Sequence, residues 1–235
     1  MNDLTLLENE LVPVYTTSAG EKVVYGTDLY SCIGSKRQYN ADELNLLLID
    51  PKEVEFSFYR NAPQVREVVT NGDRVVRKIR DMCDEMDNRY SVFAEKGVRD
   101  ISSYNEISEI KMPRIVVFIE ELADLIISQG NEVISDITRL VVKARACGIH
   151  IVLATQRPEA EFMTGKLRSN FQCRVAFSTS DIRDSQMILG RKGAEKLKGK
   201  GDGIFRTNNG AQNTRFQSAM ITEKEIKKAV KILCQ

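Results

Sequence analysis

The stretch IVVFIEELADL, residues 115–125, indicates how this chain folds. Its first five residues are all β-branched or aromatic, which is typical of a strand that is buried on both faces. Glu120 and Glu121 follow this run directly, and the pattern of a helix begins soon after them. A buried strand that ends in acids and leads into a helix predicts one βα unit of a mainly parallel sheet.

Similar units occur on both sides of this stretch. Upstream, residues 46–49 (LLLI) form an apolar run that ends at Asp50, and the next residue, Pro51, lacks the N–H that a strand ladder needs. Downstream, residues 149–154 (IHIVLA) predict another strand, which is followed by Thr155-Gln156-Arg157. Apolar residues at three- and four-residue spacing predict helices over residues 73–96 and 133–144.

Further strands are predicted at residues 174–178, 203–206 and 215–220, before a closing helix capped by Thr222 and Glu225. Together the elements predict an α/β fold whose mainly parallel sheet carries helices on both faces. Residues 1–43 are the least regular part of the sequence. We therefore expect an irregular segment at 1–43 and one domain over 44–235.

Composition excludes several classes of protein. The chain of 235 residues has 34 Lys and Arg against 33 Asp and Glu, so any nucleic-acid-binding surface must be local. The five cysteines are scattered without a C-x-x-C pair, which argues against a disulfide framework or a zinc site and favours a reducing cytoplasm. No apolar run approaches the ~20 residues that span a bilayer, so we expect no membrane segment in this sequence.

Parallel strands place the polar residues at their carboxyl ends on one edge of the sheet, where ligands of open α/β sheets bind. Asp50 and Lys52, then Glu120 and Glu121, then Thr155 and Gln156 follow the three strongest predicted strands. We expect these side chains to converge. Polar residues also follow strands in α/β proteins that bind nothing there, so this pattern alone leaves the function open.

Several stretches resemble motifs of the FtsK/SpoIIIE family of DNA translocases. IVVFIEELADL resembles the family's Walker B segment, and LLLIDPKEVEFSFY (46–59) resembles its strand carrying Asp-Pro-Lys. KARACGIHIVLATQRPEAEFMTGKLRSN (143–170) is similar to the stretch from an arginine-containing helix through the ATQRP sensor strand, and residues 85–106 and 193–205 match two further patterns. The resemblance runs from residue 44 to the C-terminus. It implies a RecA-like P-loop NTPase fold, ATP hydrolysis with Mg²⁺, hexameric rings and translocation of double-stranded DNA.

The resemblance also implies roles for single residues. Glu121 would orient or activate the attacking water, and Glu120 would hold Mg²⁺. The family's usual residue at position 120 is Asp, so the carboxylate here reaches about 1.5 Å further. Gln156 would sense the γ-phosphate, and Arg145 would act as an arginine finger across a subunit interface. Arg145 and Arg139 would equally suit a solvated helix face.

Three more residues at the predicted edge, Asp50, Lys52 and Thr155, are candidates for nucleotide binding. The string G-x-x-x-x-G-K-[ST], whose backbone N–H groups and Lys cradle phosphates, does not occur in these 235 residues. The most similar stretch, CIGSKR at 32–37, has its Gly and Lys at the wrong spacing. It also leaves no room for a P-loop helix before the strand predicted from residue 44. VVYGTDL (23–29) nevertheless resembles the family's segment before the P-loop strand. We therefore expect residues 1–43 to hold a remnant of that region and the domain to be truncated by loss of the P-loop strand, the loop and its helix.

Local positive charge predicts contacts with DNA phosphates, which would be independent of base sequence and sensitive to salt. The candidates are Arg168, Arg174, Arg191, Lys192, Lys198 and Lys200. The same residues are compatible with an ordinary solvated surface, because acids lie among them.

Two functions remain open at this point. One is an ATP-dependent DNA translocase acting in chromosome partition, cell division, sporulation or transfer of a mobile element, impaired in catalysis because the phosphate cradle is missing. The other is a non-catalytic relative that binds DNA or joins a ring of active subunits. An unrelated α/β enzyme would not explain so many motifs of one family in the same order.

Overall fold

The structure is a computed structural model that describes residues 23–26, 40–130, 132–156, 158, 163–171, 173–206, 213–218, 220 and 222–233. Eight strands form one sheet in the order β3-β2-β4-β5-β1-β6-β7-β8. Their bounds are β1 Val23–Gly26, β2 Leu44–Ile49, β3 Val65–Val69, β4 Arg114–Ile119, β5 Ile149–Thr155, β6 Cys173–Ala176, β7 Asp202–Arg206 and β8 Asn213–Gln217. The helices are α2 Gly72–Lys96, α3 Ile101–Ile107, α4 Leu122–Gln129, α5 Glu132–Lys143, α6 Gly165–Asn170, α7 Ile182–Leu189 and α8 Glu223–Leu233, with 3-10 turns η1 Ser57–Tyr59 and η2 Ala194–Lys196.

The sheet has a parallel half and an antiparallel half. β3, β2, β4 and β5 pair in parallel, whereas β1, β6, β7 and β8 join through antiparallel pairings. The expected α/β class with a parallel sheet and flanking helices is confirmed. The antiparallel half was not predicted, because the alternation of strands and helices that indicates parallel order is weak after residue 173.

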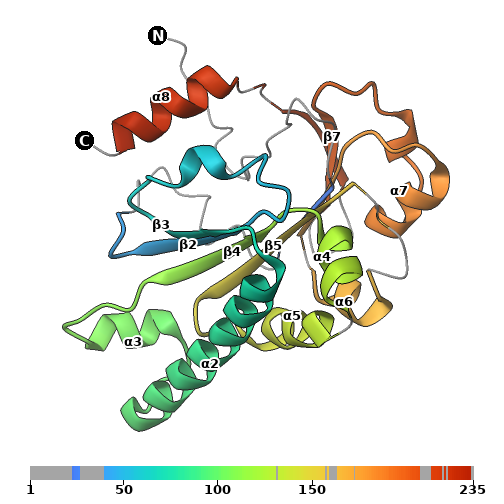
Figure 1. Ribbon diagram of the computed structural model, residues 1–235. Helices are drawn as coiled ribbons and strands as arrows, with labels where there is room; N and C mark the ends of the chain where they lie inside the picture. Colours follow the sequence, from blue (N-terminus) through green and yellow to red (C-terminus); the bar gives the residue numbers. More distant parts are fainter. Residues whose placement is uncertain are drawn as a thin grey trace.

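Most helices cover one face of the sheet. Figure 1 shows α2, α3, α4, α5 and α6 on one side, while α8 lies on the other side near η1. The covered face carries the main core, to which the odd-numbered positions of β4 contribute Ile115, Val117 and Ile119, all at most 1% exposed. The even-numbered positions face the other way, where Val116 packs in a small second cluster with Val152. This alternation follows from the two-residue period of a strand.

Helix α2 forms where the apolar spacing predicted it. Asn71 caps its start by accepting a hydrogen bond from the Arg74 N–H at 3.2 Å, and Gly97 ends it in the left-handed conformation. The predicted helix and the predicted strands at 46–49, 115–119 and 149–154 are confirmed. The pattern did not predict β3, α3, α6 or α7, and β8 begins and ends earlier than the predicted strand at 215–220.

The segment 1–43 is only partly described. Val23–Gly26 forms β1, which lies between β5 and β6 and runs antiparallel to both. Residues 1–22 and 27–39 lie outside the described residues, so the division at residue 43 stays a prediction. Within the part of the chain that the structure covers, no helix is both long enough and apolar enough to cross a bilayer.

Candidate functional site

The carboxyl ends of three neighbouring strands meet at one edge of the sheet. Ile49 of β2 pairs with Ile119 of β4, and Ile119 pairs with Leu153 of β5. The Glu120 N–H then donates to the Ile49 carbonyl at 2.9 Å, beyond the last paired residue. The expected convergence of Asp50, Glu120-Glu121 and Thr155-Gln156 at one edge is therefore confirmed. Arg157 lies outside the described residues.

Glu121 ties the end of β4 to the end of β5. Its carboxylate accepts the Thr155 hydroxyl through Oε1 at 2.6 Å and the Gln156 N–H through Oε2 at 3.0 Å. The side chain is 2% exposed. Because both oxygens accept hydrogen bonds, the carboxylate is held in one orientation between the two strands.

The backbone of Glu121 makes the turn from β4 into α4. Its φ of 51° and ψ of 73° lie in the left-handed region, which costs a non-glycine residue about 1–2 kcal/mol. Such a conformation persists only where the surroundings determine it, and it is commonest at functional sites. The hydrogen bonds to Thr155 and Gln156 supply that support here.

Glu120 precedes it and is 5% exposed, so two consecutive carboxylates are withdrawn from water at this edge. Burying carboxylates is unfavourable unless they are paired, hydrogen-bonded or bound to a cation. Among the described residues, no three His, Cys, Asp or Glu side chains gather in a way that could hold a metal by themselves. Mg²⁺ commonly takes only one or two protein carboxylates, with phosphate and water oxygens completing its shell.

Asp50 organises the loop after β2. Its Oδ2 accepts the backbone N–H groups of Glu55 and Phe56, each at 2.9 Å, and the residue is 0% exposed. Its Oδ1 has no hydrogen-bond partner among the described residues. Phe56 in turn packs edge-to-face on Phe118 of β4, with ring centroids 6.3 Å apart. Asp50 therefore holds the loop over the sheet, and nucleotide binding by Asp50 stays a prediction.

Lys52 forms an ion pair with Asp124 of α4, with Nζ 2.6 Å from Oδ2. This pair joins the loop after β2 to the helix that follows Glu121. The Lys52 side chain is 51% exposed, so the pair stabilises the fold only weakly and its ammonium group remains within reach of solvent.

Gln156 and Arg145 are exposed at opposite ends of β5. Arg145 was expected on a helix, but α5 ends at Lys143 and Arg145 lies in the turn that leads into β5. The seven residues of β5 separate it from Gln156 by about 20 Å. Arg145 therefore lies far from the carboxyl edge of its own chain, and its expected role as an arginine finger stays a prediction. Arg139 pairs with Asp87 at 2.5 Å on the surface between α5 and α2.

The six candidates for DNA contact fall into two groups. Arg174 donates to the carbonyls of Phe171, Ile188 and Arg168 at 2.8–3.1 Å, and Arg168 donates weakly to Met187. These two guanidinium groups hold β6, α6 and α7 together. The second group has exposed side chains and consists of Arg191, Lys192, Lys198 and Lys200.

The segment that carries this second group is fixed at both ends. The buried Ser185 hydroxyl donates to the Arg191 carbonyl at 2.8 Å and accepts the Ala194 N–H at 3.0 Å. At the other end, Asp202 binds the Arg215 guanidinium through both oxygens and accepts the Lys198 N–H. These contacts, chiefly those to Arg215, lower the pKa of Asp202 to about 2.

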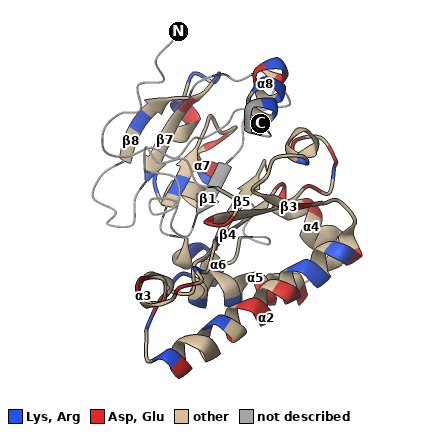
Figure 2. Ribbon diagram, turned by 90° about the vertical axis from the view of Figure 1, so that its left-hand side faces the viewer, with Lys and Arg blue, Asp and Glu red and all other residues tan. Residues whose placement is uncertain are grey.

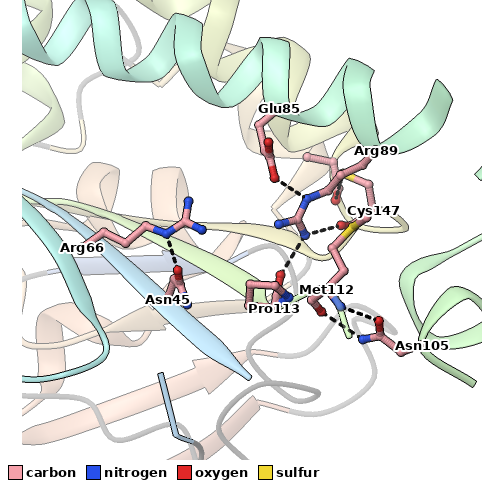
Figure 3. Close-up of polar contacts among 9 residues, drawn as sticks. Asn45, Arg66, Glu85, Arg89, Asn105, Met112, Pro113 and Cys147 are labelled. Carbon is pink, nitrogen blue, oxygen red and sulfur yellow. Dashed lines mark hydrogen bonds and ion pairs between the residues drawn. The ribbon is translucent and has the colours of Figure 1, made fainter. Parts of the chain in front are cut away.

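One structural centre was missed by the sequence patterns. Arg89 of α2 is 2% exposed and donates to Glu85 at 2.8 Å, to the Pro113 carbonyl at 2.9 Å and to the Cys147 carbonyl at 3.0 Å. Figure 3 shows the guanidinium between these three groups. It joins α2 to the segment before β4 and to the turn that carries Arg145. The sequence signals for it are the Glu85–Arg89 spacing, which ordinary surface helices share, and its place in the family pattern over residues 85–106.

Two cysteines, Cys83 and Cys147, are buried in the core. Cys147 is fully buried, and this burial raises the pKa of its thiol to about 11. Burial also raises the pKa of the Cys83 thiol. Both thiols stay protonated near neutral pH, because their pKa values lie above the ordinary value of 9.0.

Comparison with known proteins identifies the relatives. The sequence model of the FtsK/SpoIIIE family matches residues 37–111 and 107–160. DNA translocase SftA of Bacillus subtilis is 40% identical over 222 residues, which are 91% of this chain and 23% of that protein. A DNA translocase FtsK of Clostridium tetani is 38% identical over 98% of this chain and 31% of its own length. The chain thus spans about a quarter of the curated relatives that it matches.

Solved structures show the same architecture. The pCW3 conjugation coupling protein TcpA, in its monomer form with ATPγS, superposes with a TM-score of 0.73 and 25% identity over 83% of this chain and 58% of that one. The cytoplasmic domain of the Thermomonospora curvata type VII secretion ATPase EccC gives a TM-score of 0.70 and 21% identity over 83% of this chain and 24% of that one.

The strand-end carboxylates on a helix-covered parallel sheet, together with these superpositions, define an α/β domain of the RecA-like P-loop NTPase class. Within that class the chain belongs to the FtsK/SpoIIIE family.

The described residues fit only half of an ATP site. Glu120, Glu121 and Gln156 supply carboxylates and an amide at the correct edge, as the Mg²⁺ and γ-phosphate side of such a site requires. The cradle for the phosphates has no counterpart, because none of the described parallel strands leads into a glycine-rich loop and the sequence contains no G-x-x-x-x-G-K-[ST] string. We therefore derive no catalytic step through bound ATP for this chain by itself.

Proposed function

We propose that this chain is a motor segment of an FtsK/SpoIIIE-type DNA translocase, acting on double-stranded DNA in chromosome partition, cell division, sporulation or mobile-element transfer. The observation that carries the proposal is the Glu121–Thr155–Gln156 network at the shared edge of β4 and β5. An acid held in this way is suited to positioning a water molecule in phosphoryl transfer. The similarity to SftA and FtsK, which are named DNA translocases, supports duplex DNA as the substrate.

The proposed motor is impaired in this chain. Phosphoryl transfer depends on positioning and on neutralising charge, and the P-loop Lys with its backbone donors provides much of both. We infer that the chain alone hydrolyses ATP no faster than background, although Glu121 and Gln156 are in place. ATP and Mg²⁺ would be bound only in an assembly, or in a repaired chain, that supplies a phosphate cradle.

A repair experiment tests this proposal. Inserting a strand, a G-x-x-x-x-G-K-[ST] loop and its helix between residues 29 and 37 should create ATP binding, measurable with a fluorescent nucleotide. Glu120→Asp in the repaired chain should raise ATP turnover above that of the repaired chain alone, because Asp is the shorter side chain with which the family holds Mg²⁺. Glu121→Gln should abolish turnover and spare nucleotide binding. DNA-stimulated hydrolysis by the unmodified chain, lost on Glu121→Gln, would contradict the proposed impairment.

A non-catalytic relative is the second candidate. It would bind DNA, or join a ring with intact cytoplasmic subunits, and would contribute interface residues without turning over nucleotide itself. The position of Arg145 supports this role, because its side chain is exposed and lies about 20 Å from its own Gln156, on the side of the sheet away from the strand-end carboxylates.

A further inference from the structure

Helix α8 carries a row of lysines on its outer face. Lys224, Lys228 and Lys231 are spaced i, i+4 and i+7, which places them within about 60° of arc around the helix and along about 10 Å of its length. All three side chains are exposed. Figure 2 shows α8 at the outside of the molecule with basic residues along it. The row is therefore a straight strip of positive charge.

The acids of the same helix do not neutralise this row. Glu225 belongs to the cap, where it accepts the Thr222 N–H at 2.8 Å and the Thr222 hydroxyl at 2.7 Å. Glu223 pairs instead with Lys227 at 3.5 Å, and Lys227 also lies 4.8 Å above the Phe58 ring. Within the described part of the chain, Lys224, Lys228 and Lys231 have no ion-pair partner.

The opposite side of α8 is already in use. Val230 is 8% exposed and Ile226 is half-buried, on the side that contacts η1. An amphipathic helix that binds a membrane surface inserts its apolar face into the lipid, and here that face is packed against the protein. A protein partner is typically held through aromatic or Arg anchors, which the lysine row does not contain. Evenly spaced, hydrated point charges are suited to a phosphate backbone.

From this arrangement we propose that α8 is a contact surface for the backbone of duplex DNA, with Lys224, Lys228 and Lys231 each placed against a phosphate. The proposal rests on the proposed function, which supplies duplex DNA as the ligand, and it assigns a contact outside the segment 168–200. The contact is independent of base sequence, because lysines on a phosphate backbone carry no base information.

Salt dependence provides the test. The full chain is titrated against a fluorescent duplex of about 30 base pairs at several salt concentrations, and log Kd is plotted against log salt. Each phosphate contact contributes about 0.9 to the slope. The triple variant Lys224→Gln, Lys228→Gln, Lys231→Gln should lower the slope by about 2 to 3. A matched triple on the other side of the sheet, Lys96→Gln, Arg99→Gln, Lys143→Gln, removes the same charge and should leave the slope within about 0.5 of the unmodified chain.

The outcomes separate the two levels of the proposal. If the unmodified chain binds duplex DNA and both triples behave alike, the α8 contact is wrong while DNA binding stands. Phosphate contacts are strongest at low salt, of about 50 mM. If the unmodified chain does not bind duplex DNA under that condition, both the α8 contact and the proposed function are wrong. If phosphatidylserine vesicles are bound instead, and only the α8 triple loses them, the surface serves a membrane and the inference is overturned. Circular dichroism checks that each triple is folded.

Discussion

Arg89 and Arg139 show how burial changes what one residue type contributes. Both are arginines that pair with an acid of α2, but the Arg89 side chain is 2% exposed and the Arg139 side chain 41%. Arg89→Met leaves the Pro113 and Cys147 carbonyls without their donor, and an unsatisfied buried group costs about 1–3 kcal/mol. We expect Arg89→Met to lower the free energy of unfolding by about 2–4 kcal/mol, measured by urea denaturation.

Arg139→Met is the matched control, because it removes an exposed ion pair and should cost at most about 1 kcal/mol. Equal losses for the two variants would show that the buried guanidinium does not hold α2 to the sheet. The urea unfolding transition of each variant, followed by fluorescence or circular dichroism, gives its free energy of unfolding.

Residue chemistry also decided which site residues were predictable. Glu120, Glu121, Thr155 and Gln156 were found because each follows a strongly apolar strand, and strand order then brings them together. The structural role of Arg89 was missed because its partners are carbonyls 24 and 58 residues away, and a backbone carbonyl does not depend on the type of residue that carries it. The structural use of Arg174 was missed for the same reason, since it also donates to carbonyls.

At the scale of single elements, the end of α2 depends on the conformation of one glycine. Gly97 has a φ of 66°, and a Cβ added there would meet nothing within 4 Å. Gly97→Ala therefore introduces conformational strain without a clash, and we expect it to lower the free energy of unfolding by about 1–2 kcal/mol. Thermal or urea denaturation measures the change.

Gly165→Ala is the control for that substitution. Gly165 begins α6, its surroundings are equally open, and it has no positive φ. Alanine should be neutral or stabilising there by up to about 1 kcal/mol. A loss at Gly165 equal to the loss at Gly97 would contradict the conformational explanation.

The pairing of β7 with β8 should respond to acid. Arg215 and the Lys198 N–H lower the Asp202 pKa from 3.8 to about 2, so the carboxylate favours the folded state. With the folded pKa below the unfolded one, this contribution is complete above about pH 4 and is lost as the pH falls from about 4 to 2. Arg215→Met should lower stability at pH 6 and flatten the loss below pH 4, measured as the urea midpoint against pH. An unchanged acid limb in the variant would mean that other carboxyl groups dominate it.

Elements differed in how far the sequence determined them. Long α2 and the apolar strands β2, β4 and β5 have strong periodicity, and each was predicted within a few residues. Short β3, α3 and α7 have too few residues to establish a period, and their stability comes from tertiary packing. The direction of β6, β7 and β8 depends on connections, which apolar spacing does not encode.

For the whole molecule, the two ends of the parallel strands carry different residues. The carboxyl edge holds Glu121 against Thr155 and Gln156, and the opposite edge holds Arg145 in a turn that Arg89 fixes through the Cys147 carbonyl. The seven residues of β5 hold the two parts about 20 Å apart, so an arginine finger at position 145 would have to act on a neighbouring subunit.

We predict that the chain assembles with an intact FtsK/SpoIIIE motor and places Arg145 at that motor's nucleotide site. In other phosphoryl-transfer enzymes, an arginine that stabilises the transferring phosphoryl group raises kcat by about 10³–10⁵-fold. Adding the chain should therefore change ATP turnover per intact subunit, and Arg145→Ala should remove that change without preventing co-sedimentation. Arg139→Ala, which alters an exposed arginine paired with Asp87, should behave like the unmodified chain. Sedimentation of the chain only as a monomer, both alone and with the intact motor, would contradict assembly. Co-sedimentation with turnover equal for the Arg145→Ala and unmodified chains would show that the interface forms without the arginine acting in it.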